Sequence, residues 1–277
     1  MVQLRRVNFD LPPDEIVAPG HQGCAGCGVA LGMRLALKTL GSKTVLVVPH
    51  GCWSIIDGPW PYSAAGVPLM HTPPTAAAAA ASGVRAALDL KGDQDTTVCT
   101  LIDDGGQSLL LALASAAGRG ERLLFLRWDT EADLPQSDQD PLLALSGLGL
   151  AYAATANVAF PDDFTAKLVK ARRAPGTAFL HVLAPCPPSW QIPSAQAIRA
   201  ARMAVMARVF PLVEIERGQP GRLTLDPEHL PLEDYLRTQG RFRHLMDEPE
   251  ALEATRVALA QRWQHIVAAT NYSHFRD

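Results

Sequence analysis

Short apolar runs alternate along the chain with longer segments whose apolar residues recur at helical spacing. The short runs are rich in Val, Leu, Ile and Phe and predict buried strands at Thr44–Pro49, Thr97–Ile102, Leu123–Trp128 and Ala178–Leu183. The longer segments predict helices at Gly28–Leu40, Thr75–Leu90, Ser108–Ala117 and Asp162–Arg172. This alternation indicates an α/β fold, a parallel sheet with helices on both faces.

The two ends of the chain depart from the alternation. Residues 1–22 are irregular and contain prolines, which predicts an N-terminal arm lying over the surface. From residue 210, short β-like stretches precede a final helix, Glu248–Ala269, with one apolar face. We therefore predict an arm (1–22), an α/β domain (23–209) and a C-terminal extension (210–277) that packs on this domain or on a partner subunit.

Composition excludes several classes of protein. Of the 277 residues, 48% are hydrophobic and 19% are charged, as in ordinary globular proteins, and the net charge of −3 leaves no excess of cations for nucleic acid. No signal peptide is recognised, and the longest apolar run, Ala76–Ala81, is too short to cross a membrane. We expect a cytoplasmic protein that binds neither nucleic acid nor membrane.

The residues that follow the predicted strands are the first candidates for a site, because parallel sheets bind ligands at the carboxyl ends of their strands. In chain order, these loops contain His50-Gly51-Cys52, then Asp103-Asp104-Gly105-Gly106, then Asp129-Thr130-Glu131, and last Pro185-Cys186-Pro187. Each loop offers a cysteine, an acid or a pair of glycines.

The cysteines predict metal or redox chemistry rather than disulfides in a reducing compartment. Cys24 and Cys27 form a C-x-x-C pair, and Cys52 and Cys186 are distant single residues that each follow a strand. Four thiolates at one sheet edge suit a [4Fe–4S] cluster or zinc, and unliganded buried cysteines are the remaining alternative. Cys99 lies inside a strand and is predicted to be a core residue.

An acid–glycine turn suggests a phosphate site. Asp104-Gly105-Gly106 ends a strand and leads into a helix, where a carboxylate can ligate Mg²⁺ and the helix N-terminus favours an anion. Asp-Gly is also a common turn pair, so the turn alone is weak support. Thr130 and nearby carbonyls could complete the oxygen ligands, and the combination suits a diphosphate cofactor.

Together these segments resemble the beta subunits of the pyruvate:ferredoxin oxidoreductase (pyruvate synthase) family, over essentially the whole chain. The resemblance rests on motifs that occur in the family's order: Gly20–Gly28, His50-Gly51-Cys52, Pro61-Tyr62, Val67-Pro68, His71, Ala81-Ser82-Gly83, Ala184–Trp190 and Gln239–Leu245. It implies a thiamine-diphosphate-binding fold and oxidative decarboxylation of a 2-oxoacid, with electrons passing to the cluster and the acyl group to coenzyme A. An alpha subunit would complete the thiamine site, and gamma and ferredoxin-like subunits would complete the enzyme.

The resemblance also implies a site residue by residue. It makes Cys24, Cys27, Cys52 and Cys186 the ligands of the cluster, and it makes Asp104, Thr130 and the carbonyl of Ala132 the ligands of Mg²⁺. Gly51, Cys52, Asp103, Gly105 and Gly106 would contact the cofactor. The positions of the remaining residues suggest their roles: His50 borders both sites and either packs there, the more ordinary role, or handles protons, and Trp53, Trp60 and Trp190 flank the motif loops and would shield the cluster.

The sequence departs from the family pattern near the expected diphosphate. Asp103 replaces a usual glycine, Gln107 a threonine and Leu109 an aspartate, and Asp133–Ser137 replaces a loop that wraps the cofactor. One interpretation is a pocket reshaped for an unusual, bulkier 2-oxoacid. Another is a non-catalytic electron-relay or assembly subunit that keeps only the cluster, and a third is a zinc-stabilised binding module. The retained Asp104 and Thr130 favour the first.

Overall fold

The computed structural model describes residues 11–59, 61–102, 107–134, 142, 145–227 and 229–270. Asp103, Asp104, Gly105, Gly106, Trp60 and the segment 135–137, which carry several of the predictions above, lie outside the described residues. Among the helices of the described part, none combines the length and the apolarity that crossing a bilayer requires.

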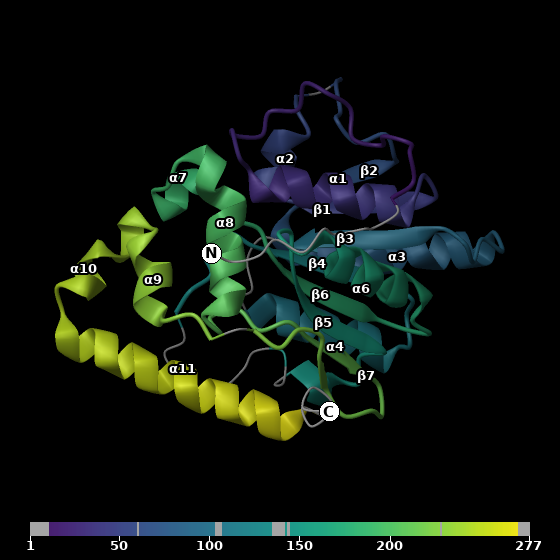
Figure 1. Ribbon diagram of the computed structural model, residues 1–277. Helices are drawn as coiled ribbons and strands as arrows, with labels where there is room; N and C mark the ends of the chain where they lie inside the picture. The colour runs from purple at the N-terminus through teal and green to yellow at the C-terminus, as the bar shows by residue number, and fades with distance from the viewer. Residues whose placement is uncertain are drawn as a thin grey trace.

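A twisted sheet forms the centre of the protein, with its strands in the order β2-β1-β3-β4-β6-β5-β7-β8 (Figure 1). The strands are β1 Thr44–Pro49, β2 Leu69–Thr72, β3 Thr97–Ile102, β4 Leu124–Asp129, β5 Tyr152–Asn157, β6 Ala178–Leu183, β7 Val213–Glu216 and β8 Arg222–Leu223. The pairings from β2 to β5 are parallel, and β7 and β8 add antiparallel strands at one edge.

Helices follow most of the strands and cover the sheet. They are α1 Gly28–Leu40, α2 Cys52–Ile56, α3 Ala77–Leu90, α4 Gln107–Gly118, α6 Pro161–Arg173, α7 Pro187–Trp190, α8 Ala197–Met206, α9 Leu232–Arg237, α10 Arg243–Met246 and α11 Pro249–Ala269. The predicted α/β fold is therefore confirmed. The predicted strands and helices are each present, with ends that differ by at most two residues.

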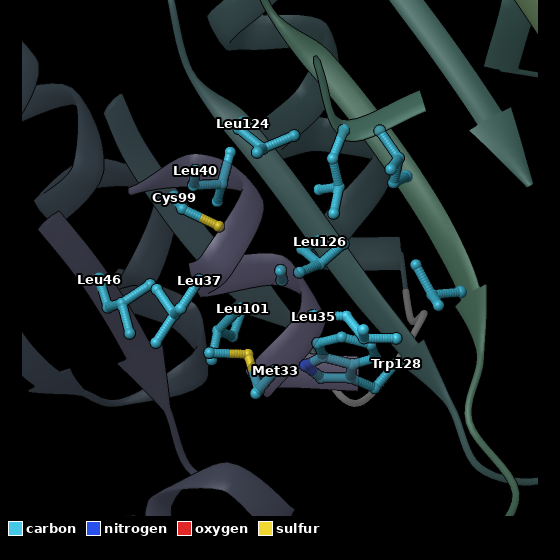
Figure 2. Close-up of a cluster of buried hydrophobic side chains, with 14 of the residues drawn as sticks. Met33, Leu35, Leu37, Leu40, Leu46, Cys99, Leu101, Leu124, Leu126 and Trp128 are labelled. Atoms are coloured by element: carbon cyan, nitrogen blue, oxygen red, sulfur yellow. The ribbon is translucent and has the colours of Figure 1, made fainter. Parts of the chain in front are cut away.

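One face of the sheet is covered by α1 and α6. Leu37 and Leu40 of α1 lie against Leu46 of β1 and Cys99 of β3, and Trp128 of β4 closes the cluster (Figure 2). Cys99 is fully buried here, so its prediction as a core residue is confirmed, and burial raises the pKa of its thiol to about 12. Its thiol takes no part in the site.

The opposite face packs against α3, α4 and α11. Ala77 and Ala81 at the start of α3 are buried among Val47, Val98 and Phe125, so this alanine-rich segment lies directly on the sheet. The long helix α11 runs along the lower side of the view in Figure 1 and buries Trp263 and Ile266. Val257 of the same helix is half exposed, although its apolar side chain suits the buried face that the sequence predicts.

A third apolar cluster lies beyond the carboxyl ends of β4 and β6. It contains Trp190 from α7, residues of α8, and Tyr235 and Phe242 from the C-terminal region. Because Ala132 and Cys186 pack into this cluster, the C-terminal segments support the two loops that carry candidate ligands. The fold thus places residues from positions 132, 186 and 242 in one neighbourhood.

Candidate active site

The C-x-x-C loop leads directly into α1. Cys27 is the N-cap of this helix, and its Sγ accepts a hydrogen bond from the amide of Ala30 at 3.5 Å. Burial raises the pKa of the Cys27 thiol, the nearby Cys24 and Cys186 raise it further, and the amides of Ala30 and Val29 act in the opposite direction. Amide donors at a helix N-terminus favour a thiolate, the form that binds metals.

The loop that carries Cys186 is packed against the start of α1. The amide of Gly28 donates to the carbonyl of Pro185 at 2.9 Å, and a Cβ at position 28 would lie 2.4 Å from the Pro185 ring. Gly26, at φ +74°, leaves similar room for Ser194. Gly28 therefore allows the two cysteine loops to touch, and Gly26 allows the first of them to approach Ser194 beyond α7.

The third cysteine loop approaches from β1. Cys52 begins α2, and the carbonyl of Ile56 at the end of α2 accepts the amide of Gln22 at 3.0 Å. Cys24 and Cys52 are exposed, whereas Cys27 and Cys186 are half-buried. Hydrogen bonds link these loops, but no group of three or more His, Cys, Asp or Glu side chains in the described ranges is arranged to hold a metal ion.

Gly51 and His50 connect β1 to α2. Gly51 is the N-cap of α2 in an extended conformation, and the hydroxyl of Ser54 donates to its carbonyl at 2.7 Å. His50, directly after β1, is exposed. His21, on the C-x-x-C side, accepts the amide of Gly23 on its Nδ1 at 3.1 Å, so its ring caps the cysteine loop.

An oxygen-rich loop follows β4. The carboxylate of Asp129 accepts the amides of Glu131 and Ala132 at 3.0 and 2.8 Å, and its other oxygen lies 2.8 Å from Nε2 of His181. Burial alone would raise the pKa of Asp129, but its interactions with His181, together with the amide of Ala132 and the charge of Arg127, hold this pKa well below its usual range. Asp129 therefore stays ionised and shapes the loop.

This loop presents the predicted oxygen ligands. Ala132 has φ +48°, an unusual conformation for a residue with a Cβ. The two hydrogen bonds that Asp129 accepts from backbone amides maintain it. The carbonyl of Thr130 accepts Nε1 of Trp190 at 2.6 Å, while its hydroxyl makes no hydrogen bond with any described residue. Thr130 and Ala132 border a cavity of about 320 Å³ that His181 and Arg127 also line.

Three residues contribute more to this region than their sequence context indicated. His181 lies in an apolar run, where a structural role is the ordinary interpretation, yet it pairs with Asp129 across neighbouring strands. Trp190 was expected only to shield the cluster, and it also fixes Thr130. Arg241 lies in a recognised motif, but only the fold shows that it reaches the carbonyl of Glu131.

Comparison with known proteins gives consistent results. The chain is 36% identical to the pyruvate synthase subunit PorB of Methanothermobacter thermautotrophicus over 87% of its length and 94% of that protein. It is 35% identical to the ketoisovalerate oxidoreductase subunit VorB of Pyrococcus abyssi, with 92% and 94% covered. No model of a known protein family matches the sequence.

A solved structure matches the fold at lower identity. A chain of the 2-oxoglutarate:ferredoxin oxidoreductase from Magnetococcus marinus, with 2-oxoglutarate, coenzyme A and succinyl-CoA bound, aligns with a TM-score of 0.51 and 20% identity. The alignment covers 71% of this chain and 82% of that one. Fold and relatives thus define one class of protein, the subunits of 2-oxoacid oxidoreductases. Within this class, the chain belongs to the family of the PorB and VorB subunits.

Proposed function

We propose that this chain binds thiamine diphosphate, Mg²⁺ and one [4Fe–4S] cluster as the beta subunit of a 2-oxoacid oxidoreductase. In this enzyme a 2-oxoacid is oxidatively decarboxylated, single electrons pass to the cluster, and the acyl group passes to coenzyme A. One observation carries the proposal. Trp190 binds the carbonyl of Thr130 and its own amide binds the carbonyl of Cys186, so the cysteine loop and the oxygen loop are direct neighbours.

The thiols of Cys24, Cys27, Cys52 and Cys186 would hold the cluster. The pairing of one C-x-x-C with two distant single cysteines fits a [4Fe–4S] cluster better than a zinc ribbon, which usually has two close pairs. The amide of Ala30 at Cys27 suits a thiolate ligand. Cluster insertion would draw the three loops together, since metal binding and local folding are coupled.

The oxygen loop would hold Mg²⁺ and the diphosphate. Thr130 would contribute its hydroxyl, Ala132 its carbonyl and Asp104 its carboxylate, a donor set of hard oxygens that suits Mg²⁺. The hydroxyl of Thr130 makes no hydrogen bond with the described residues and is available for this role, and Asp129 holds the backbone of Ala132 through its amide. The backbone at Gly51, Asp103, Gly105 and Gly106 would lie against the cofactor.

When bound, thiamine diphosphate supplies the nucleophilic carbon that attacks the 2-oxo carbon of the substrate, and the cluster accepts the electrons. Cys52, which follows β1 at the same sheet edge as Thr130, would be a ligand of the cluster and would also contact the cofactor. His50, exposed beside it, would exchange a proton with the substrate or solvent. An alpha subunit would complete the thiamine site, and gamma and ferredoxin-like subunits would carry electrons onward.

The test is an analysis of the complete complex purified without oxygen. We expect iron and sulfide at about four each per chain, with stoichiometric thiamine diphosphate and Mg²⁺. Turnover should depend on one or more members of a panel of straight, branched and aromatic 2-oxoacids, and should require coenzyme A and an electron acceptor.

Other results would support other functions. A complete cluster without thiamine, and no turnover of any 2-oxoacid, would indicate an electron-relay or assembly subunit. Zinc without iron would indicate a zinc-stabilised binding module. Either outcome would overturn the proposed function.

A further inference from the structure

The C-terminal segment Gln239–Phe242 contacts both candidate cofactor loops, although it lies outside both. The guanidinium of Arg241 stacks between two rings, 4.5 Å from the centroid of Trp190 and 4.3 Å from that of Phe242. The same group donates a hydrogen bond to the carbonyl of Glu131. Arg241 therefore joins the loop after β4 to the helix that follows Cys186.

Trp190 makes the second connection between these loops. Its indole is fully buried and donates Nε1–H to the carbonyl of Thr130 at 2.6 Å. Its backbone amide donates to the carbonyl of Cys186 at 2.8 Å, which closes the single turn of α7. A shift of Cys186 would therefore be transmitted through one helical turn and one rigid ring to Thr130.

The surroundings hold Arg241 in this geometry. Its Nε donates to the side chain of Gln239 at 3.0 Å, and Gln239 is itself buried and bonded to the carbonyl of Tyr235 at 3.3 Å. Gly240 donates to the carbonyl of Gln191 at 3.3 Å, and a Cβ on Gly240 would lie only 2.8 Å from the side chain of Gln191. The guanidinium is thus held in place by Gln239 of its own segment, and the backbone of that segment is held by Gln191 in the segment after α7.

We propose that Arg241 and Trp190 are positioning residues that fix the Cys186 loop and the Thr130–Ala132 loop relative to each other. If the proposed function holds, on which this role in cofactor binding rests, the spacing between one cluster ligand and the magnesium ligands is set by these two side chains. This role requires neither residue to touch the substrate or to transfer charge. Their contribution is a constant distance between the site of chemistry and the electron acceptor.

Hydrogen exchange in the full-length chain tests this coupling without any cofactor. We expect Arg241→Gln to raise exchange about tenfold at the amides of residues 131–132 and of residue 190 together, because a stacked, charge-assisted contact is lost from both loops. Arg241→Lys should restore little, since an ammonium cannot stack between two rings and donate in the same plane. Arg243→Gln, on an exposed side chain two residues away, is the matched control.

Trp190→Phe separates the two connections. This variant keeps an aromatic ring against Arg241, and it keeps the hydrogen bond from the backbone amide of residue 190 to the carbonyl of Cys186. It removes the indole N–H that donates to the carbonyl of Thr130. We expect faster exchange at residues 131–132 and nearly unchanged exchange at residue 190. If Arg241→Gln loosened only one loop, or if Arg243→Gln loosened both equally, the coupling would not exist.

The assembled complex provides the second readout. In Arg241→Gln, the Mg²⁺ concentration for half-maximal thiamine diphosphate binding should rise about tenfold, and the electron paramagnetic resonance signal of the reduced cluster should change shape. Wild-type complex that binds no thiamine would refute the proposed function and leave the exchange result valid. Wild-type complex that binds both cofactors, with an Arg241→Gln complex indistinguishable from it, would refute only the positioning role.

Discussion

The complex with Cys27→Ala is expected to retain little iron and to lose electron transfer to an external acceptor by at least about a hundredfold. Cys27 is the cysteine whose surroundings are best arranged for a ligand. It caps α1, accepts the amide of Ala30, and lies within electrostatic range of Cys24 and Cys186. Its loss would leave three thiols and remove the ligand nearest the helix N-terminus. Iron and sulfide analysis, with reduction of a dye acceptor, measures the effect.

Cys99→Ala is the matched control, because this cysteine is fully buried in the core between α1 and the sheet. The substitution removes one sulfur from the same chain and should cost some stability, but it should leave iron, sulfide and electron transfer at their wild-type levels. If correctly folded Cys27→Ala protein kept its full iron content, Cys27 would not be a ligand of the cluster, and the proposed arrangement of the site would be wrong.

The strands that sequence analysis located share a simple physical property. Each central strand is buried on both faces, so its residues form a nearly continuous apolar run, as in Ala178–Leu183, which His181 alone interrupts. β2, Leu69–Thr72, was missed because it is an edge strand with exposed residues and only four positions. β5, Tyr152–Asn157, was missed although it is fully buried, because its alanines also suit a helix and pairing with β6 and β7 makes it a strand.

The candidate site was predictable to the extent that its residues follow strands. Cys52, Thr130 and Cys186 were identified in this way, and the structure places each at a carboxyl end of the sheet. The pairing of Asp129 with His181 could not be predicted, because it depends on the register of β4 against β6. The contact between Arg241 and Glu131 spans 110 residues and depends on how the C-terminal segment packs.

Ala132 shows a different limit of prediction from sequence, which concerns backbone conformation. Nothing in its identity predicts a left-handed conformation, which glycine or asparagine would adopt more readily. The two amides that Asp129 accepts hold the loop in this shape, so the strain at position 132 is offset by an ionised neighbour. The oxygen ligands therefore depend on a carboxylate that is not itself among the predicted ligands.

Gly28→Ala is expected to disrupt the cluster site without changing any cysteine. In isolation the change should favour α1, since alanine is a better helix former than glycine by up to about 1 kcal/mol. In the protein the new methyl group would lie 2.4 Å from Pro185 and 2.6 Å from the carbonyl carbon of Ala184, so the two cysteine loops must separate. We expect the free energy of unfolding to fall by about 3 kcal/mol and iron content to fall about tenfold.

Chemical denaturation of the full-length chain and iron analysis of the complex measure these two effects. Gly118→Ala is the matched control, because Gly118 ends α4 and a methyl group there would meet no atom within 4 Å. It should leave iron content unchanged and stability equal or slightly higher, as expected when a helix gains alanine. The argument depends on backbone proximity alone. If Gly28→Ala kept the stability and iron content of the wild type, the Cys27 and Cys186 loops would not need their close contact. The cluster would then tolerate a wider separation than the packing of Gly28 on Pro185 implies.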